Sequence, residues 1–461
     1  MSKEGLLPVA RQLFGTDGVR GVAGEYPLDP KTVHALGMAL GDIAARHSSD
    51  PEVVIGMDTR ESGPWIAGQV AGGLARRGAR VRFAGVTTTP GIAYLTRSQS
   101  FVAGVMISAS HNPYQDNGIK VFDHSGYKLP DGEEHAIERE MFAFLEAGID
   151  AASCSLVPDP GLDRHYVDFL AGTIHRSLAG LRIVVDCGNG AASRLAAELF
   201  ELLGAKVVTI CAEPDGRNIN LGCGALYVEK LQERVLGEGA DAGVAFDGDA
   251  DRALFISRQG RIVDGDGVLL IAARRLQALG RLTGPGGRPA VIATVMSNLG
   301  LERALAARGI GLTRTPVGDK YVLEEMLRSG AVLGGEQSGH VIFLDCATTG
   351  DGLLTALRVF EIMVESDSGL DDLTSELEIY PQRLVNVRVK SRRPLSELPA
   401  VTEEIRAAER AFGDAGRVLV RFSGTEPLAR VMVEGPELAQ VEAFASRIAG
   451  VIERELGSAA E

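Results

Sequence analysis

This chain of 461 residues has few cysteines and few aromatic residues, no long apolar run and no excess of positive charge. It holds one tryptophan and five cysteines, and aromatic residues make up only 5% of it. The cysteines are odd in number and none forms a Cys-x-x-Cys pair, so we expect no disulfide framework and no bond between Cys211 and Cys223. The cysteines instead indicate small buried side chains in a reducing compartment.

Long apolar runs are also missing. No stretch of about 18 apolar residues could cross a bilayer, and the N-terminal segment has no apolar core of the kind found in signal peptides. We therefore expect a soluble, cytoplasmic protein with no membrane partner.

An excess of positive charge is missing as well. Lysine and arginine total 47 against 61 aspartates and glutamates, a formal net charge of −14. Affinity for nucleic acid comes from basic surface, so nucleic acid is not an expected partner, whereas a small anionic substrate fits if basic groups gather locally. No Gly-x-x-x-x-Gly-Lys-Ser/Thr occurs, which disfavours an ordinary nucleoside triphosphatase. The Gly-x-Gly-x-x-Ser run that starts at Gly188 is an incomplete dinucleotide fingerprint, and close strand–helix packing accounts for its glycines.

The chain does contain a repeated α/β pattern. Its composition is globular, with 45% hydrophobic and 23% charged residues, and its length suggests three or four domains of about 100–200 residues. An apolar strand, a polar loop, an Ala/Leu-rich helix, a glycine and a second strand follow one another three times, with first strands near residues 53, 181 and 290. This order favours parallel crossovers and three related mixed α/β domains.

The C-terminal part follows another pattern. Strands are predicted at 384–389, 417–421 and 430–434, and helices at 399–412 and 437–456, which indicates a smaller α+β domain. The predicted domains are 1–158, 159–258, 259–374 and 375–461.

Three aspartates form the most informative motif. Asp247, Asp249 and Asp251 alternate with small residues, follow an apolar run and lead into Arg252. In an extended backbone, side chains two apart share a face, so the three carboxylates are expected to converge. They would repel one another unless a cation neutralised them, and oxygen ligands suit Mg²⁺, which takes further ligands from water and phosphate. The segment predicts a magnesium site near phosphate; the alternative is a solvated acidic turn.

A serine-rich turn supplies the second motif. An apolar run that starts at Val105 reads as a buried strand and leads to Ser110, His111 and Asn112. Pro113 keeps Asn112 out of the helical region, so Ser110 is offered at the tip of a strand. His111 is the only candidate base next to Ser110, but neighbouring side chains of an extended chain point to opposite faces. A serine that carries a phosphoryl group fits a metal site better than one that attacks a carbonyl. An ordinary turn is the alternative.

Three further glycine-containing loops carry polar side chains. One has an arginine, two hydroxyls and exposed backbone N–H groups, which suit a phosphate dianion. A second offers hydrogen-bonding groups that suit sugar hydroxyls, and a third places an arginine near the start of the chain. Each alone could be a polar turn. Their residues are Arg421, Ser423, Gly424, Thr425 and Arg430; Glu336, Ser338 and His340; and Arg20.

Together these segments resemble the α-D-phosphohexomutase superfamily, most closely the bacterial phosphoglucosamine mutases. The likeness runs from Phe14 to about Glu434, and the motifs occur in the order typical of the family. It implies three mixed α/β domains and a fourth, TATA-binding-protein-like α+β domain around one cleft, and it is compatible with a homodimer. It further implies reversible conversion of glucosamine 6-phosphate and glucosamine 1-phosphate through a phosphoserine and a 1,6-bisphosphate. That reaction supplies the UDP-N-acetylglucosamine pathway.

The resemblance also implies roles for individual residues. One Mg²⁺ per active site would be held by the phosphorylated serine and the aspartate trio, and glucosamine 1,6-bisphosphate or a similar bisphosphate would act as intermediate or activator. The metal ligands would be Ser110, Asp247, Asp249 and Asp251. The catalytic candidates are Ser110, Lys120, Arg20, Arg252 and His111. A small phosphosugar would be bound by Glu336, Ser338 and His340 at the sugar and by Arg421, Ser423, Gly424, Thr425 and Arg430 at the phosphate.

Three positions bear on how close the likeness is. Gln337 fits the glucosamine branch better than the glucose and mannose branch. Phe422 stands where a proline is usual, and Lys320 replaces a frequent arginine, keeping the charge but losing bidentate geometry.

Alternative functions remain open at this point. A phosphomannomutase/phosphoglucomutase would use the same chemistry on another sugar. An aspartyl-phosphate-type phosphatase could use Asp247 as its nucleophile, although Asp251 fills a place usually held by Thr or Val. A non-catalytic phosphosugar sensor would need neither the serine nor the three carboxylates.

Overall fold

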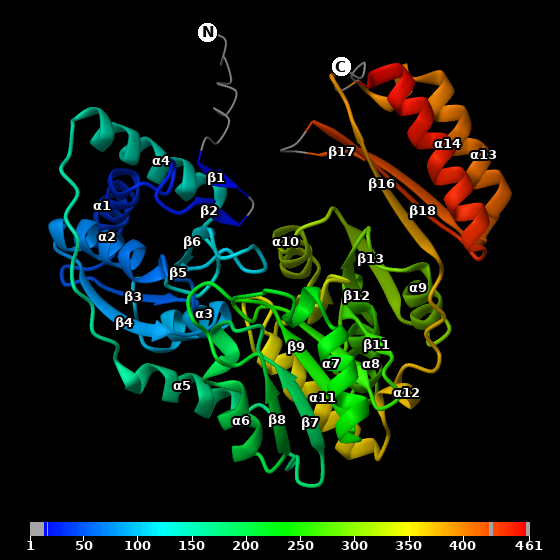
Figure 1. Cartoon of the computed structure of the whole chain (residues 1–461), viewed down its shortest axis with the longest axis horizontal. Coiled ribbons are helices and arrows are strands. Elements are labelled where there is room, and N and C mark those ends of the chain that lie inside the picture. The colour runs from blue at the N-terminus through cyan, green and yellow to red at the C-terminus, as the bar shows by residue number, and fades with distance from the viewer. Residues whose placement is uncertain (1–12, 16, 392, 424–426, 458–461) are drawn as a thin grey trace. The chain divides into compact units, whose positions relative to one another are not determined.

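The computed structural model describes residues 13–15, 17–391, 393–423 and 427–457 (Figure 1). The chain divides into two compact units, one of residues 1–296 and 310–375 and the other of residues 297–309 and 376–461. Across the described residues, every helix is too short or too polar to span a bilayer.

The first unit begins with a six-stranded mixed sheet in the order β1-β2-β6-β5-β3-β4. Strand β3 is parallel to β4 and β5, whereas β6 is antiparallel to β5 and β2. The elements are β1 Phe14–Gly15, β2 Gly18–Val22, α1 Pro30–His47, β3 Glu52–Met57, α2 Gly63–Arg76, β4 Arg80–Val86, α3 Thr89–Ser98, β5 Ala103–Ile107, β6 Asp116–Asp123 and α4 Asp131–Glu146.

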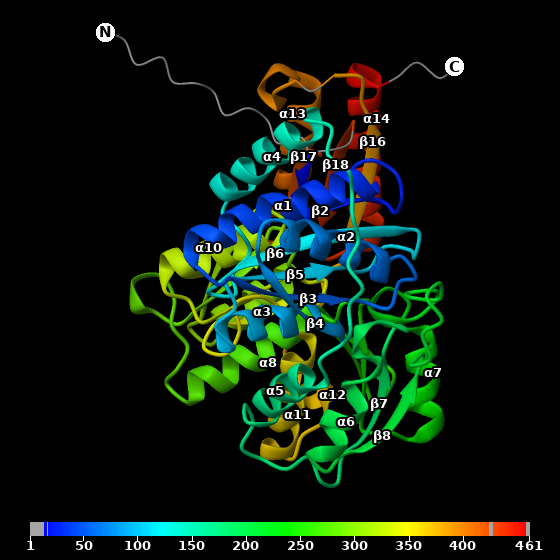
Figure 2. The same cartoon turned by 90° about the vertical axis from the view of Figure 1, so that its left-hand side faces the viewer.

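Helices cover both faces of this sheet, because alternate strand residues point to opposite sides. Val53, Ile55 and Val105 join one buried cluster with α1 and α2, while Val54 and Met106 join another with α3. Figure 2 shows α1 and α2 on one side of the strands and α3 on the other. Buried on both faces, β3 and β5 read as continuous apolar runs.

Two smaller mixed sheets complete the first unit, in the orders β11-β10-β9-β7-β8 and β13-β12-β14-β15. The elements of the first are α5 Pro160–Ala171, β7 Arg182–Asp186, α6 Ala196–Leu202, β8 Lys206–Ile210, α7 Glu229–Glu238, β9 Ala242–Phe246, β10 Ala253–Ser257 and β11 Ile262–Val263. Those of the second are α8 Gly265–Ala278, β12 Ala290–Thr294, β13 Gly311–Thr315, α10 Asp319–Ser329, β14 Leu333–Gly335, β15 Val341–Phe343, α11 Gly352–Ser366 and α12 Leu370–Leu373.

The three sheets share one arrangement of four strands. In each, a central strand is parallel to two neighbours, and the second of these pairs with an antiparallel strand: β4-β3-β5-β6, β8-β7-β9-β10 and β13-β12-β14-β15. The prediction of three related mixed α/β domains is confirmed. The predicted domain boundaries remain a prediction.

The second unit contains a three-stranded antiparallel sheet in the order β16-β18-β17. Helices α13 and α14 cover one face of it (Figure 1), and Val431, Val441 and Ile448 lie in their shared core. The prediction of a smaller α+β domain is confirmed. The elements are α9 Leu299–Ala306, β16 Gln382–Arg388, α13 Pro399–Phe412, β17 Arg417–Phe422, β18 Leu428–Glu434 and α14 Leu438–Leu456.

Asp351 gives the first unit an unusual dependence of stability on pH. Its buried carboxylate caps α11, accepting a hydrogen bond from Leu354 N (3.0 Å) and one from the Tyr166 hydroxyl (2.8 Å). Burial raises the pKa of Asp351 to about 6. Because the folded state holds this proton more tightly than the unfolded chain, the stability it contributes is lost as the pH rises through about 6.

We therefore expect Asp351→Asn, which mimics the neutral acid, to gain about 2–3 kcal/mol in unfolding free energy relative to the parent between pH 4 and pH 8. Urea unfolding at each pH measures it. Asp159→Asn is the control. Arg82 lowers the pKa of this other helix-capping carboxyl, so the stability difference between that variant and the parent should stay nearly constant between pH 4 and pH 8 and change only at lower pH. A pH-independent difference for Asp351→Asn would contradict the prediction.

Candidate active site

The sequence motifs occupy the same place in each of the three sheets. Ser110 lies between β5 and β6, the aspartate trio between β9 and β10, and Glu336 to His340 between β14 and β15. Each loop therefore joins the third strand of the shared arrangement to its antiparallel partner. The repeated topology brings chemically different loops to equivalent positions.

Ser110 contacts the aspartate loop directly. Its buried hydroxyl donates to Asp247 Oδ2 at 2.6 Å, although the two residues are 137 apart in the chain. Ser110 also adopts a left-handed backbone, with φ of 52°, so the chain is not extended there. As a result the Ser110 Oγ lies 3.3 Å from His111 Nδ1, and the expectation that adjacent side chains would diverge is wrong.

The three aspartates converge as predicted, but not along an extended strand. Residues 247–252 form a tight loop between the antiparallel strands β9 and β10, with Ala250 at φ of 56°. One oxygen from each carboxylate lies within 4.8 Å of the others, and all three side chains are buried. A hairpin loop, and not the two-residue repeat of a strand, gathers these oxygens.

The charges of this cluster fit a divalent cation. Burial, together with the carboxylates of Asp251 and Asp249, raises the pKa of Asp247 well above its usual value. Asp249 Oδ1 and Asp251 Oδ1 are buried and, among the residues that the structure describes, accept no hydrogen bond. Three buried carboxylates, two of them with an unused oxygen, are a donor set that a hard cation such as Mg²⁺ takes in proteins.

Lys120 partly balances this negative charge. Its buried ammonium lies 2.8 Å from Asp249, 3.1 Å from Asp17 and 3.5 Å from Asp251. Burial alone would lower the pKa of Lys120, but these carboxylates raise it well above its usual value. Lys120 is therefore held in its charged form.

The remaining catalytic candidates surround the same loops. Arg252 donates its backbone N–H to Asp247 Oδ1 at 3.1 Å, and Arg20 pairs with Asp17. The Nε atoms of both arginines are buried and have no hydrogen-bond partner among the described residues. Burial and the nearby guanidinium groups of Arg252 and Arg20 lower the pKa of His111 to about 4, so its imidazole is neutral near pH 7.

The predicted sugar loop reaches the aspartates through His340. The His340 Nδ1 lies 3.6 Å from Asp251 Oδ1, and its ring is buried. Glu336 is half-buried and accepts a hydrogen bond from Gly318 N at 3.0 Å, while Ser338 is exposed. His340 thus belongs to the aspartate cluster, and Glu336 and Ser338 lie beside it with surface open to solvent.

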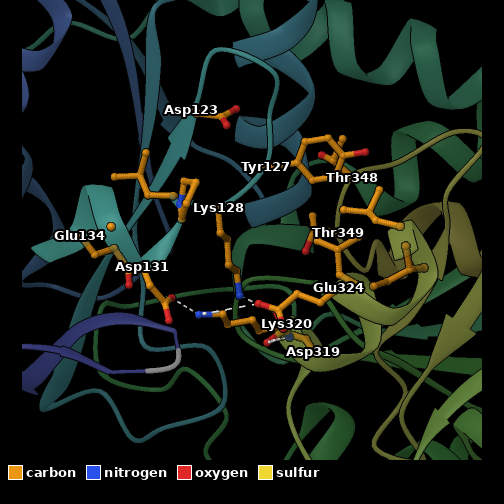
Figure 3. Close-up of a pocket in the computed structure, with 16 residues that line it drawn as sticks. Asp123, Tyr127, Lys128, Asp131, Glu134, Asp319, Lys320, Glu324, Thr348 and Thr349 are labelled. Carbon is orange, nitrogen blue, oxygen red and sulfur yellow. Dashed lines mark hydrogen bonds and ion pairs between the residues drawn. The ribbon is translucent and has the colours of Figure 1, made fainter. Parts of the chain in front are cut away.

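A cavity of about 620 Å³ lies between the segment after β6 and helix α10 (Figure 3). One of its lining residues, Asp319, leads toward the cluster, since its Oδ2 lies 3.9 Å from His340 Nε2. Lys128 extends from one wall to Asp319 on α10, at 2.5 Å, and also pairs with Asp17. Lys320 pairs across the cavity with Asp131 and so is engaged in ion pairs within the protein. These pairs join the six-stranded sheet's loops to α10.

The predicted phosphate loop lies in the second unit, between β17 and β18. Arg421 and Arg430 stand directly opposite each other across the two antiparallel strands. Like charges in such a cross-strand pair repel, and partial burial with the Arg430 charge lowers the pKa of Arg421. An anion would relieve this repulsion. Ser423 is buried beside them, whereas Gly424 and Thr425 lie outside the described residues.

Some residues at the site were missed by sequence reasoning. Asp17 and Lys128 pair with the residues named above, and Thr89 donates its hydroxyl and its backbone N–H to Asp249. Gly190, in the run that resembles a dinucleotide fingerprint, packs against the aspartate loop: a Cβ there would lie 2.4 Å from Gly248 O. Its packing role fits the structural explanation of those glycines.

Comparison with known proteins agrees with this geometry. Four family models of phosphoglucomutase/phosphomannomutase match along the chain: alpha/beta/alpha domain I at residues 11–147, domain II at 156–260, domain III at 264–380 and the C-terminal domain at 384–451. A phosphoglucosamine mutase of Solibacter usitatus is 64% identical over 97% of this chain and 100% of its own length. The chain belongs to the phosphoglucosamine mutase family.

Other members of the family are more distant. A phosphoglucosamine mutase of Koribacter versatilis is 50% identical over 97% of this chain and 98% of its own. Among solved structures, a phosphoglucomutase/phosphomannomutase family protein of Burkholderia thailandensis superposes with a TM-score of 0.77 at 25% identity, covering 95% of this chain and 97% of that one. The phosphoglucosamine mutase family is a family of enzymes. The loops described above therefore form the candidate active site of this protein.

Proposed function

We propose that this protein reversibly converts glucosamine 6-phosphate and glucosamine 1-phosphate through a phosphoserine at position 110 and a glucosamine 1,6-bisphosphate intermediate. The observation that carries the proposal is the 2.6 Å contact between Ser110 and Asp247 inside the aspartate cluster. It supports the proposal because it brings a serine hydroxyl beside three buried carboxylates that could hold a cation. Membership of the phosphoglucosamine mutase family supports glucosamine phosphate as the substrate.

In the first half of the reaction, the bond between phosphorus and Ser110 Oγ breaks and a new bond forms to the free hydroxyl of the sugar phosphate. The bisphosphate then turns within the site, and its other phosphoryl group returns to Ser110. Phosphoryl transfer depends mainly on positioning and on neutralising charge. Arg20 and Arg252 would contribute positive charge there, since both guanidinium groups have N–H atoms that no described residue accepts.

One Mg²⁺ would be held by Asp247, Asp249, Asp251 and the phosphate on Ser110. When bound, it supplies charge neutralisation for the phosphoryl oxygens. The carboxylates themselves orient the serine, because Asp247 accepts its hydroxyl hydrogen bond.

In the first half of the reaction the sugar hydroxyl loses its proton and Ser110 Oγ gains one. In the second half the Ser110 hydroxyl loses its proton and the sugar oxygen gains one. His111 is neutral near pH 7 and lies 3.3 Å from Ser110 Oγ, so it can accept the serine proton when the phosphoryl group returns. Lys120 is held charged by its carboxylate neighbours and can donate a hydrogen bond or a proton to a phosphoryl oxygen.

The sugar and phosphate loops would set substrate choice. Glu336, Ser338 and His340 would bind sugar hydroxyls. The side chain of Gln337, which favours the glucosamine branch, hydrogen-bonds to Asp264 at the start of α8. Its influence on the sugar would therefore pass through the shape of the loop.

The phosphate that is not transferred would bind Arg421, Ser423 and Arg430. We expect Arg421→Ala to raise the KM for glucosamine 6-phosphate by about 10- to 100-fold, because a charge-assisted hydrogen bond to phosphate contributes roughly 1.5–3 kcal/mol. Phosphorylation of Ser110 by glucose 1,6-bisphosphate should change less. Steady-state kinetics and intact mass spectrometry measure the two effects, and Arg383→Ala on β16 is the control. An unchanged KM would contradict the prediction.

A coupled assay that compares glucosamine, glucose and mannose phosphates, with Mg²⁺ and a trace of bisphosphate, tests the proposed substrate. We expect the highest kcat/KM for glucosamine phosphate, and a preference for glucose or mannose phosphate would overturn that choice. Phosphate found on Asp247 instead of Ser110 by mass spectrometry would favour the phosphatase alternative. Absence of any turnover would favour the sensor. A cytoplasmic location and a homodimer remain predictions.

A further inference from the structure

Arg60 is a completely buried arginine that takes no part in the mechanism above. It follows β3 in a loop, and both its side chain and that of Asp58 are inaccessible to solvent. A guanidinium group has five N–H donors in a fixed planar fork, and burying it is costly unless all of them are paired.

All five N–H donors of Arg60 are paired, and four of them donate to backbone carbonyls of the loop that runs from β5 to the first residue of β6. Nη2 donates to the carbonyls of Ser110 (2.9 Å) and Asn112 (2.8 Å). Nη1 donates to the carbonyls of Pro113 and Asp116, the latter at 3.0 Å. Nε donates to Asp58 Oδ2 at 2.9 Å. A single side chain therefore ties the whole turn from Ser110 to the start of β6.

The same turn is fixed from two other directions. Ser108 Oγ donates to Asp58 Oδ2 at 2.6 Å and accepts the Ser110 N–H at 2.9 Å. Asn220, from the five-stranded sheet's loops, donates its Nδ2 to the carbonyls of Ser110 (2.9 Å) and Asn112 (3.2 Å). Both polar backbone groups of Ser110 are thus held by side chains.

This matters because Ser110 has a left-handed backbone, which is unfavourable for a non-glycine residue and persists only where the surroundings enforce it. The Ser110 carbonyl also touches the metal loop: a Cβ on Gly248 would lie 2.5 Å from it. Rotation of the Ser110 backbone would break the hydrogen bond between its hydroxyl and Asp247. It would also change the contact between its carbonyl and Gly248.

We propose that Arg60 is a positioning residue for phosphoryl transfer, which locks the Ser110 peptide so that Oγ points at the aspartate cluster, and that Asn220 assists it from the sheet that carries the metal loop. The proposal rests on the function proposed above. It specifies arginine: a lysine has three donors and no planar fork, so it cannot serve the five acceptors at once.

Arg60→Lys and Asn220→Ala in the full-length protein with Mg²⁺ test this. Each variant is incubated with glucose 1,6-bisphosphate, its Ser110 phosphate is quantified by intact mass spectrometry, and kcat and KM are expressed per phosphorylated molecule. We expect Arg60→Lys to lower kcat by about 100-fold with KM changed less than about 3-fold, as for a reacting group misplaced by about 1 Å. Asn220→Ala should lower kcat less, also with little change in KM.

Chemical rescue distinguishes positioning from general destabilisation. Guanidinium ion at concentrations that do not unfold the protein should restore part of the kcat of Arg60→Ala, because it can refill the buried site, and should not restore that of Ser110→Ala. Arg97→Lys is the matched control, since Arg97 also donates to a carbonyl, that of Cys346, and its variant should keep the parent kcat.

Parent-like kcat per phosphorylated molecule in Arg60→Lys would overturn the positioning role. If Arg60→Lys does not fold, parent-like kcat in Asn220→Ala together with no guanidinium rescue of Arg60→Ala would overturn it equally. A parent protein that never carries phosphate on Ser110 would overturn the proposed function itself, so the two failures are distinguishable.

Discussion

Ser110→Ala is expected to lower turnover by about 10⁴-fold or more while leaving the unfolding temperature within a degree or two of the parent. In the proposed reaction this hydroxyl is the group that accepts and returns the phosphoryl group, and no other described hydroxyl donates to Asp247. Alanine keeps the backbone contacts that Arg60 and Ser108 make to residue 110. The fold should therefore survive the loss of chemistry.

A coupled assay and thermal unfolding measure the two halves of this prediction. Ser125→Ala serves as the matched control, because among the described residues Ser125 hydrogen-bonds through its side chain to Asp123 alone, in the turn after β6. Intact mass spectrometry should find no added phosphate on the Ser110 variant after incubation with bisphosphate. Turnover at the parent rate in that variant is incompatible with the proposed scheme.

Removal of divalent metal is expected to abolish turnover. It should also make Asp247 destabilising, whereas with Mg²⁺ bound the same carboxylate stabilises the folded protein. Without a cation, the burial and like charges that raise the pKa of Asp247 make its ionised form unfavourable in the folded protein. In EDTA, Asp247→Asn should therefore be at least as stable as the parent. With Mg²⁺ at 100 times its Kd the parent should gain about 2.7 kcal/mol, a gain that the variant should largely lose.

Unfolding in urea with EDTA or with Mg²⁺ gives these four free energies. Asp163→Asn is a control, because burial also raises the pKa of Asp163, on α5, outside the aspartate loop. That variant should respond to Mg²⁺ as the parent does. Equal responses of the parent and Asp247→Asn to Mg²⁺ would remove Asp247 from the ligand set.

The sequence was informative where local pattern and tertiary structure depend on the same physics. Buried strands such as β3 and β5 are continuous apolar runs, and helices α13 and α14 carry their buried apolar residues at helical spacing, so these elements were predicted within a few residues. The aspartate trio could be recognised because three carboxylates so close in the chain need a counter-charge wherever the backbone turns.

Other aspects of the site could not be read from the chain. The convergence of the aspartates was attributed to an extended strand, whereas Ala250 turns the loop with a positive φ. The proximity of His111 to Ser110 depends on a left-handed residue that nothing in the local sequence announces. Arg60 was missed because four of its five acceptors are backbone carbonyls, which every sequence supplies.

Lys320 shows a different limit. It replaces a frequent arginine and so loses bidentate geometry, but in the structure its ammonium pairs with Asp131 across the cavity beside α10. The charge is used to connect two parts of the first unit, and a compact ammonium suffices for one carboxylate.

The three sheets each have an equivalent hairpin, and each hairpin carries a different set of functional side chains. One hairpin carries the serine, one the carboxylates and one the polar groups that we propose bind the sugar, and each is anchored by strands whose buried residues need not change with it. Evolution could therefore alter the preferred sugar by rewriting residues 336–340 alone, while the transfer chemistry of the other two hairpins stayed intact. Exchanging residues 336–340 between family members should therefore change the preferred sugar while the serine and aspartate hairpins stay the same.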